Sequence, residues 1–283
     1  MLAFVSIALV CRGEHATIPA EMQEQCSQLL LPLSGCATIR AMTTETEKSI
    51  PRTARERARA EITREILDAA LRHQATDGAP ALSLRAIARD LGMASSAVYR
   101  YVASRDELLT RLIVDAYDSL GEAAETAEAR ADRSDLPGRW SAICIAVRSW
   151  AIANPNRYAL IYGSPVPGYV APPDTVAPAS RVAELLTRIL LDATASGRLA
   201  PEVTSDSVSP TASEALAPLR EFIGPGVSDT LIQRGVMVWT GLYGEVSFEL
   251  FGQLHNVIGE GPGEREAWFA ECIRRWAVQV GIA

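Results

Sequence analysis

The sequence predicts an all-α protein in which a small domain of three helices, residues 50–112, is followed by a larger helical domain, residues 113–283. Apolar residues recur at spacings of three and four positions through most of the chain after residue 50, which is the period of an amphipathic helix. Segments rich in proline, glycine and serine separate these stretches and mark where helices end. The composition, 48% hydrophobic and 22% charged, is typical of a globular protein with a sizeable core.

Residues 1–49 are expected to be a disordered leader. The apolar segment 1–10 has no Lys or Arg in front of it, so the positive region of a secretory signal is missing. Three of the five cysteines lie in the leader at wide spacing, which matches neither a metal site nor a disulfide framework, and they are interpreted as unpaired: Cys11, Cys26 and Cys36. A polar, charged segment begins at Met42. We hypothesise that Met42 is the biological start and residues 1–41 an upstream extension; an intact mass from the native host that includes residues 1–41 would contradict this.

The three helices of the small domain are predicted from caps and spacing. The first opens within a run of arginines and ends near His73. Ser83 can cap the second, whose apolar positions are Leu84, Ile87, Ala88 and Leu91. Gly92 ends that helix because glycine readily takes the left-handed conformation. Ser95 then caps a short helix over residues 96 to about 102, and the S-x-x-E pair Ser104 and Glu107 starts a long helix over residues 105 to about 129.

Two short helices around a tight turn, with a longer helix behind them, form a helix-turn-helix. The small residues Ser95, Ser96 and Ala97 suit insertion of the second short helix into a major groove, and the amide dipoles at its start favour an anion. Further along, hydroxyl and guanidinium donors for phosphate oxygens come from Tyr99, Tyr101 and Arg105.

Residues from about 53 to 112 resemble the DNA-binding domain of TetR-family transcriptional regulators. The resemblance rests on the helix, the glycine turn, the small-residue helix that ends Tyr99-Arg100-Tyr101, and the Arg105-Asp106-Glu107-Leu108-Leu109 that follows. Val102 stands where the family commonly has Phe, and Arg105 where Lys is usual; arginine keeps the phosphate charge. The predicted DNA-binding residues are Arg55, Ser83, Arg85, Ser95, Ser96, Ala97, Tyr99, Arg100, Tyr101 and Arg105.

The charge distribution agrees with this interpretation. Residues 50–111 carry 11 Lys and Arg against 8 Asp and Glu, whereas residues 112–283 carry 13 against 21. A basic small domain and an acidic larger domain are expected if only the small domain contacts phosphate. An arginine run opens the first helix, where an arm could contact the DNA backbone or a minor groove: Arg52, Arg55, Arg57, Arg59 and Arg64. The alternative is a solvated helix face that pairs with Glu56, Glu61 and Glu65.

The larger domain is predicted to be a set of helices joined by proline-rich connections. A core helix ends at Asn154, since a residue before proline avoids the helical region. A connection rich in serine, proline and threonine is expected over residues 197–213. The helical patterns span residues 140–151, 156–161, 181–195, 213–222, 228 to about 254, and 264–280.

The segment WTGLYG, which begins at Trp239, resembles the C-terminal ligand-binding domain of a TetR subgroup named for a W-x-x-x-H-G motif, with Tyr243 in place of the histidine. The loop 157–169 also looks like that subgroup, so the resemblance covers most of residues 50–280. It implies an N-terminal helix-turn-helix domain followed by a larger helical ligand-binding and dimerisation domain. Four glycines within one helical stretch, at positions 235, 241, 244 and 252, each cost up to about 1 kcal/mol relative to alanine, and close helix approach is the reason we expect.

The resemblance also implies partners. These are a double-stranded DNA operator, a small-molecule effector and a second copy of the chain, which pairs through the last two long helices; no cofactor or metal is expected. Two recognition helices on a two-fold dimer read half-sites roughly 34 Å apart or a multiple of it. Few charges fall within the middle helices, so a mostly apolar effector and release from a palindromic operator are predicted. The candidate pocket residues, for each of which core packing is the alternative, are Trp150, Tyr158, Tyr162, Phe222, Trp239 and Tyr243.

Two other classes of function are alternatives. A helical enzyme has little support, because the three histidines, His15, His73 and His255, are far apart in sequence and no P-loop, G-x-S-x-G or H-E-x-x-H motif occurs. A TetR-like protein that acts through protein partners without specific DNA binding is the other alternative, and the intact Tyr99, Tyr101 and Arg105 argue against it. No apolar run reaches the roughly 18 residues of a membrane span, so a cytoplasmic protein without a membrane partner is expected.

Overall fold

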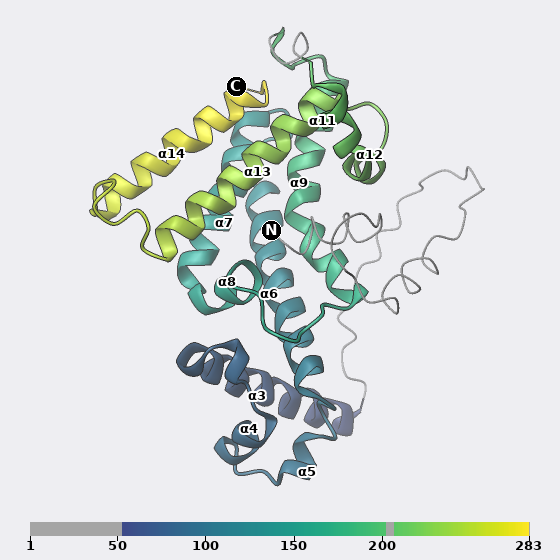
Figure 1. Ribbon diagram of the computed structural model, residues 1–283, viewed down its shortest axis with the longest axis vertical. Coiled ribbons are helices and arrows are strands. Elements are labelled where there is room, and N and C mark those ends of the chain that lie inside the picture. The colour runs from purple at the N-terminus through teal and green to yellow at the C-terminus, as the bar shows by residue number, and fades with distance from the viewer. Residues whose placement is uncertain (1–52, 202–206, 283) are drawn as a thin grey trace, which may run out of the picture. The chain divides into compact units, whose positions relative to one another are not determined.

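The computed structural model describes residues 53–201 and 207–282, and the predictions for the leader and for Arg52 lie outside this part of the chain. Every regular element within it is a helix, which confirms the all-α prediction (Figure 1). The chain divides between Leu108 and Leu109 into two compact units, each with its own internal contacts. Across the described residues, none of the helices combines the length and the apolar character that crossing a bilayer requires.

The smaller unit is built from three helices and the start of a fourth. Thr53 caps the first of them, and its hydroxyl accepts from the Glu56 amide while the Glu56 carboxylate accepts from the Thr53 amide. The apolar faces meet in a core that includes the fully buried Ile66, Ile87 and Leu108. The elements are α3 (Ala54–Asp77), η1 (Ala79–Ala81), α4 (Leu84–Asp90), α5 (Ser95–Val98) and the beginning of α6 (Arg105–Glu128).

Helix α4 begins and ends at the predicted residues. The Ser83 hydroxyl accepts from the amide of Ala86 at 3.4 Å. At the other end Gly92 has φ 63°, its amide donates to the Arg89 carbonyl, and the Met93 amide donates to the Ala88 carbonyl at 2.8 Å. These two bonds satisfy carbonyls that the helix end would leave open, and the left-handed geometry makes a glycine favourable here.

Helix α5 differs from the prediction. It is a single turn, Ser95–Val98, followed by a turn over residues 99–101, instead of a helix from 96 to about 102. Ala94 rather than Ser95 occupies the N-cap position, with φ −65° and ψ 138° and no capping side chain, because the chain leaves the Gly92 turn extended and enters the helix at Ser95.

The predicted capping box in front of α6 is also only half present. The Ser104 hydroxyl accepts from the Glu107 amide at 3.0 Å, as expected, whereas the Glu107 carboxylate accepts from the Ala103 amide at 2.6 Å, one residue earlier than the prediction.

The larger unit contains most of α6 and the remaining helices. Two predicted elements differ from the structure. The helix expected over residues 213–222 is two short helices that meet at Leu216, and the helix expected to reach about residue 254 ends at Leu250, because Gly252 beyond it has φ 79°. The elements are α7 (Leu136–Ala153), α8 (Pro155–Tyr162), η2 (Pro173–Thr175), α9 (Val176–Ala195), α11 (Pro210–Ala215), α12 (Ala217–Ile223), α13 (Asp229–Leu250) and α14 (Pro262–Gln279).

The core of the larger unit surrounds α7, which packs against α9, α13 and α14. Trp140, Ile143 and Val147 of α7 are almost completely buried in it. Buried among these helices is also one charged side chain, Arg139, with only 1% of its surface exposed.

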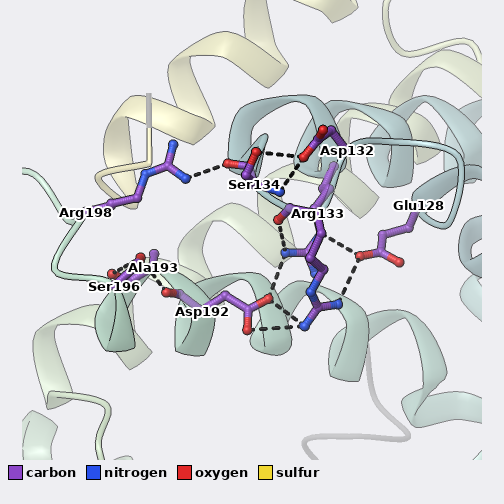
Figure 2. A network of polar contacts seen from close by, with 9 residues as sticks. Glu128, Asp132, Arg133, Ser134, Asp192, Ala193, Ser196 and Arg198 are labelled. Atoms are coloured by element: carbon purple, nitrogen blue, oxygen red, sulfur yellow. Dashed lines mark hydrogen bonds and ion pairs between the residues drawn. The ribbon is translucent and has the colours of Figure 1, made fainter.

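Arg139 joins three segments of the chain. Its Nε donates to Glu128 of α6 at 2.6 Å, one Nη donates to Asp192 of α9 at 2.7 Å, and the same nitrogen donates to the Arg133 carbonyl at 3.3 Å. The exposed Arg133 pairs with the same Asp192 (Figure 2). Burial opposes the charge of Arg139, but the hydrogen bonds to Asp192 and Glu128 outweigh it and raise the pKa of the guanidinium.

The glycines in and after α13 differ in their surroundings. A Cβ placed on Gly241 would lie 3.1 Å from Trp276 Nε1 on α14, so the predicted close approach of helices is confirmed at this residue. A Cβ on Gly244 would meet nothing within 4 Å, so the prediction fails there within one copy of the chain. Gly252 lies after the helix end and is explained by its positive φ instead.

Candidate nucleic-acid interface and aromatic core

The turn that begins at α5 presents polar side chains outward from an apolar base. Val98 and Val102 are fully buried and hold the segment in the core of the smaller unit. Ser95, Ser96 and Arg100 are exposed, and 46% of the Tyr99 surface is accessible. This arrangement leaves small residues exposed at the start of the helix and polar donors at its end.

The other predicted DNA-binding residues differ in exposure. Arg55 on α3 and Arg85 on α4 are exposed and available to a phosphate backbone. Ala97 and Tyr101 are half-buried, and Ser83 is half-buried with its hydroxyl used as the α4 cap. The structure therefore brings the predicted set onto one small unit, with Ser83 already engaged in a structural contact.

Arg105 makes structural contacts within the smaller unit. Its guanidinium is predicted to hold phosphate, and in the structure Nη2 donates to the carbonyls of Ala79 and Pro80, at 3.2 Å each. Nη1 lies 3.6 Å from the Asp106 carboxylate. The side chain therefore fastens the start of α6 to η1, a contact between residues 25 and 26 positions apart that no local sequence pattern reveals. The side chain is half-buried, and its contact with phosphate stays a prediction.

Four of the six predicted pocket residues form one aromatic cluster in the larger unit. The rings of Tyr162 and Tyr243 lie 4.3 Å apart, Tyr158 and Tyr162 lie 5.0 Å apart, and Trp239 and Tyr243 lie 5.4 Å apart, measured between centroids. Tyr117 of α6, which was not among the candidates, meets Tyr162 edge to face at 6.0 Å. Its place in the sequence indicated only a helical core position.

Hydrogen bonds satisfy the most deeply buried of these phenols. The Tyr158 hydroxyl donates to the Tyr243 carbonyl at 3.1 Å and lies 2.9 Å from the Ser247 hydroxyl. Burial raises the pKa of Tyr117 and of Tyr158 to about 12, and it raises the pKa of Tyr162 well above its ordinary value. The cluster therefore offers uncharged hydroxyls and aromatic faces at physiological pH.

The remaining two candidates stand apart from the aromatic cluster. Trp150 is buried in the same core and donates from Nε1 to the Ser119 hydroxyl at 2.9 Å. Phe222, whose role as a pocket residue stays a prediction, lies on α12 with 46% of its surface exposed, outside the buried core of the larger unit. It lines a shallow depression of about 300 Å³, formed with Glu184, Thr187, Arg188, Leu191 and Ile223.

A helix-turn-helix in the smaller unit, followed by a larger helical unit with its own core, is consistent with the class of two-domain DNA-binding regulators. Comparison with known proteins places the chain within that class. Residues 66–112 match the profile of bacterial regulatory proteins of the tetR family, and residues 140–276 match the tetracyclin repressor-like C-terminal domain. The chain belongs to the TetR family of transcriptional regulators.

Relatives support the assignment across both units. HTH-type transcriptional regulators of Mycobacterium bovis and Mycobacterium tuberculosis are each 44% identical to the chain over 218 residues, which is 74% of this chain and 89% of theirs. The crystal structure of the regulatory protein SCO4313 is 34% identical with a TM-score of 0.63, over 79% of this chain and 98% of that one. A Rhodococcus protein of unknown function, 23% identical with a TM-score of 0.55 over 76% of this chain and 94% of its own, shares the fold.

These findings confirm that the protein is a DNA-binding regulator of the helix-turn-helix type and not an enzyme. The C-terminal match is to a tetracyclin repressor-like domain, and its description does not name the W-x-x-x-H-G subgroup. Membership of that subgroup stays a prediction.

Proposed function

We propose that the protein is a repressor that binds a palindromic operator as a homodimer and leaves it when a small, mostly apolar effector enters the larger unit. The observation that carries the DNA-binding part is the α5 turn, in which buried Val98 and Val102 support an exposed row of serines and donors. Ser95, Ser96 and Ala97 face the base edges in this proposal, and Tyr99 and Arg100 contact phosphate.

The proposed dimer uses the outer faces of α13 and α14. Met237 and Phe248 on α13 and Trp268 and Val278 on α14 are 43–54% exposed, an unusual set of large apolar side chains to leave in water. Gly244 lies on α13 between the first two of these, with open space beside its Cα. A second copy packed two-fold on this face would cover the apolar side chains and approach the glycine closely.

The proposed effector site is the aromatic cluster of Tyr117, Tyr158, Tyr162, Trp239 and Tyr243. Its faces and neutral hydroxyls favour an apolar molecule with few polar groups. We propose that the effector shifts α6, which is shared by both units in sequence, and changes the spacing of the two recognition helices. A compound of this class should raise the melting temperature and weaken operator binding together; one that binds without affecting the operator complex argues against the site as regulatory.

Arg100→Ala tests the DNA-binding assignment. If Arg100 neutralises one phosphate, its loss should weaken binding to all DNA sequences and reduce the slope of log K against log salt concentration by about 0.9. Ser96→Ala should change the preferred base at one position of each half-site and leave that slope unchanged. Fluorescence anisotropy on an operator duplex selected from a random library, at four salt concentrations, measures both. Folded variants that match the parent in slope and preference would overturn the proposed residue roles.

A further inference from the structure

The DNA-reading turn needs support from outside itself. Helix α5 is a single turn, and helices this short are not stable on their own in water. Val98 and Val102 fix its inner side, but residues 99–101 between them form only a turn. The amides of Tyr99, Arg100 and Tyr101 donate to the carbonyls of residues 95, 97 and 98. None of these bonds uses the Arg100 carbonyl, so its hydrogen-bond donor must come from elsewhere.

Arg59, on α3, supplies that partner. Its Nη2 donates to the Arg100 carbonyl at 2.9 Å, although the two residues are 41 positions apart in the chain. Its guanidinium carbon also lies over the ring of Tyr101, 5.2 Å from the centroid, within the range of a cation–π contact. One side chain therefore holds both the backbone and a ring of the turn that follows the recognition helix.

Its neighbour in the same arginine run differs. Arg57 is exposed on α3 and makes no side-chain hydrogen bond or ion pair with any residue in 53–201 or 207–282. The two arginines have the same charge and lie on the same helix, but only Arg59 reaches the α5 turn. This difference separates a positioning role from a general electrostatic one.

We propose that Arg59 is a positioning residue, which sets the orientation of α5 and of Tyr99 and Arg100 toward DNA by clamping residues 100 and 101, and that it does not itself contact phosphate. The proposal rests on the DNA-binding role of the α5 turn. A phosphate contact would be sequence-independent and would add to the salt dependence. A positioning residue determines how well α5 fits the base edges of the operator. Its loss therefore weakens specific binding more than non-specific binding.

The test compares Arg59→Ala, Arg59→Lys and Arg57→Ala with the parent chain, on the selected operator duplex and on an unrelated duplex over a range of salt concentrations. Arg59→Ala should lower operator affinity on the order of fivefold to tenfold relative to Arg57→Ala, which corrects for the lost charge. The ratio of operator to unrelated affinity should fall by a similar factor while the salt slope matches that of Arg57→Ala. Arg59→Lys, which can still donate to the carbonyl and sit over the ring, should recover part of the ratio.

A double-mutant cycle measures the coupling between Arg59 and Tyr101, which a general loss of stability would not produce. Tyr101→Leu removes the ring but leaves the carbonyl, so the losses in operator affinity from Arg59→Ala and Tyr101→Leu should be less than additive in the double variant. Additive losses would show that Arg59 and Tyr101 do not act together and would overturn the clamp. A salt slope reduced by about 0.9 relative to Arg57→Ala, at a constant specificity ratio, would show a phosphate contact and would overturn it as well. If Arg100→Ala also leaves binding unchanged, the DNA-binding assignment of the turn fails; if Arg100→Ala weakens binding and Arg59→Ala does not, only the clamp fails.

Discussion

Replacing Gly244 by arginine is expected to weaken operator binding by roughly 100-fold or more, because it should separate the two copies that bind the two half-sites together. Within one copy the substitution is tolerated, since a Cβ on Gly244 meets nothing within 4 Å and its φ is not in the left-handed region. At a two-fold interface the same change places two bulky, like-charged side chains against each other. The apolar face around Phe248 would then return to water.

The measurement pairs the molar mass in solution with the affinity for full and half operators. The Gly244→Arg variant should be monomeric. Its affinity for a half operator should be about the same as the affinity of the parent for a half operator. Ala195→Arg, which adds the same charge at an exposed position near the end of α9, is the matched control and should remain dimeric. If Gly244→Arg stays dimeric with full operator affinity, then α13 is not at the interface.

Replacing Arg139 by alanine is expected to lower the free energy of unfolding by about 3 kcal/mol. Removing one partner of a buried ion pair leaves the other charge without compensation, and Glu128 is only 12% exposed. The lower end of the usual range applies because Asp192 is 33% exposed and keeps its contact with Arg133. The loss also removes the hydrogen bonds that join α7 to Glu128 of α6, to the Arg133 carbonyl and to Asp192 of α9, in the network of Figure 2.

Urea denaturation measures this change in the free energy of unfolding, from the transition in which the larger unit unfolds. The Arg133→Ala variant is the control. Arg133 pairs with the same Asp192 at 2.9 Å, but 64% of its side chain is exposed, so its loss should cost less than about 1 kcal/mol. Equal losses for the two variants would mean that burial does not distinguish the two arginines.

Capping and turn residues in the sequence predicted where helix α4 begins and ends, because these positions depend on residues close together in the chain. Ser83 and Gly92 determine where α4 begins and ends, and the sequence contains both determinants within ten residues of each other. The length of α5 was overestimated because the aromatic residues after Val98 fit a helical spacing, whereas the backbone forms a turn there and is held by Arg59.

Contacts between residues far apart in the chain account for what could not be predicted. The hydrogen-bond partners of Arg59, Arg105 and Arg139 lie between 6 and 53 positions away, and no periodicity indicates which arginine in a run will find one. The four clustered aromatics among the pocket candidates were recognisable by type and helical spacing. Phe222 has the same properties, but it lies on the short helix α12 beside a surface depression, and only the packing of α12 explains the difference.

Binding to DNA at a defined sequence is the central claim, and one measurement tests it most directly. The purified full chain is titrated, at stated salt, onto a labelled fragment of the DNA immediately upstream of its own gene, with an unrelated fragment as competitor. We expect saturable binding that survives the competitor and is lost on adding salt, with two copies of the chain per operator. Binding that the unrelated fragment removes in proportion to its concentration, both here and on duplexes selected from a random library, would contradict the account.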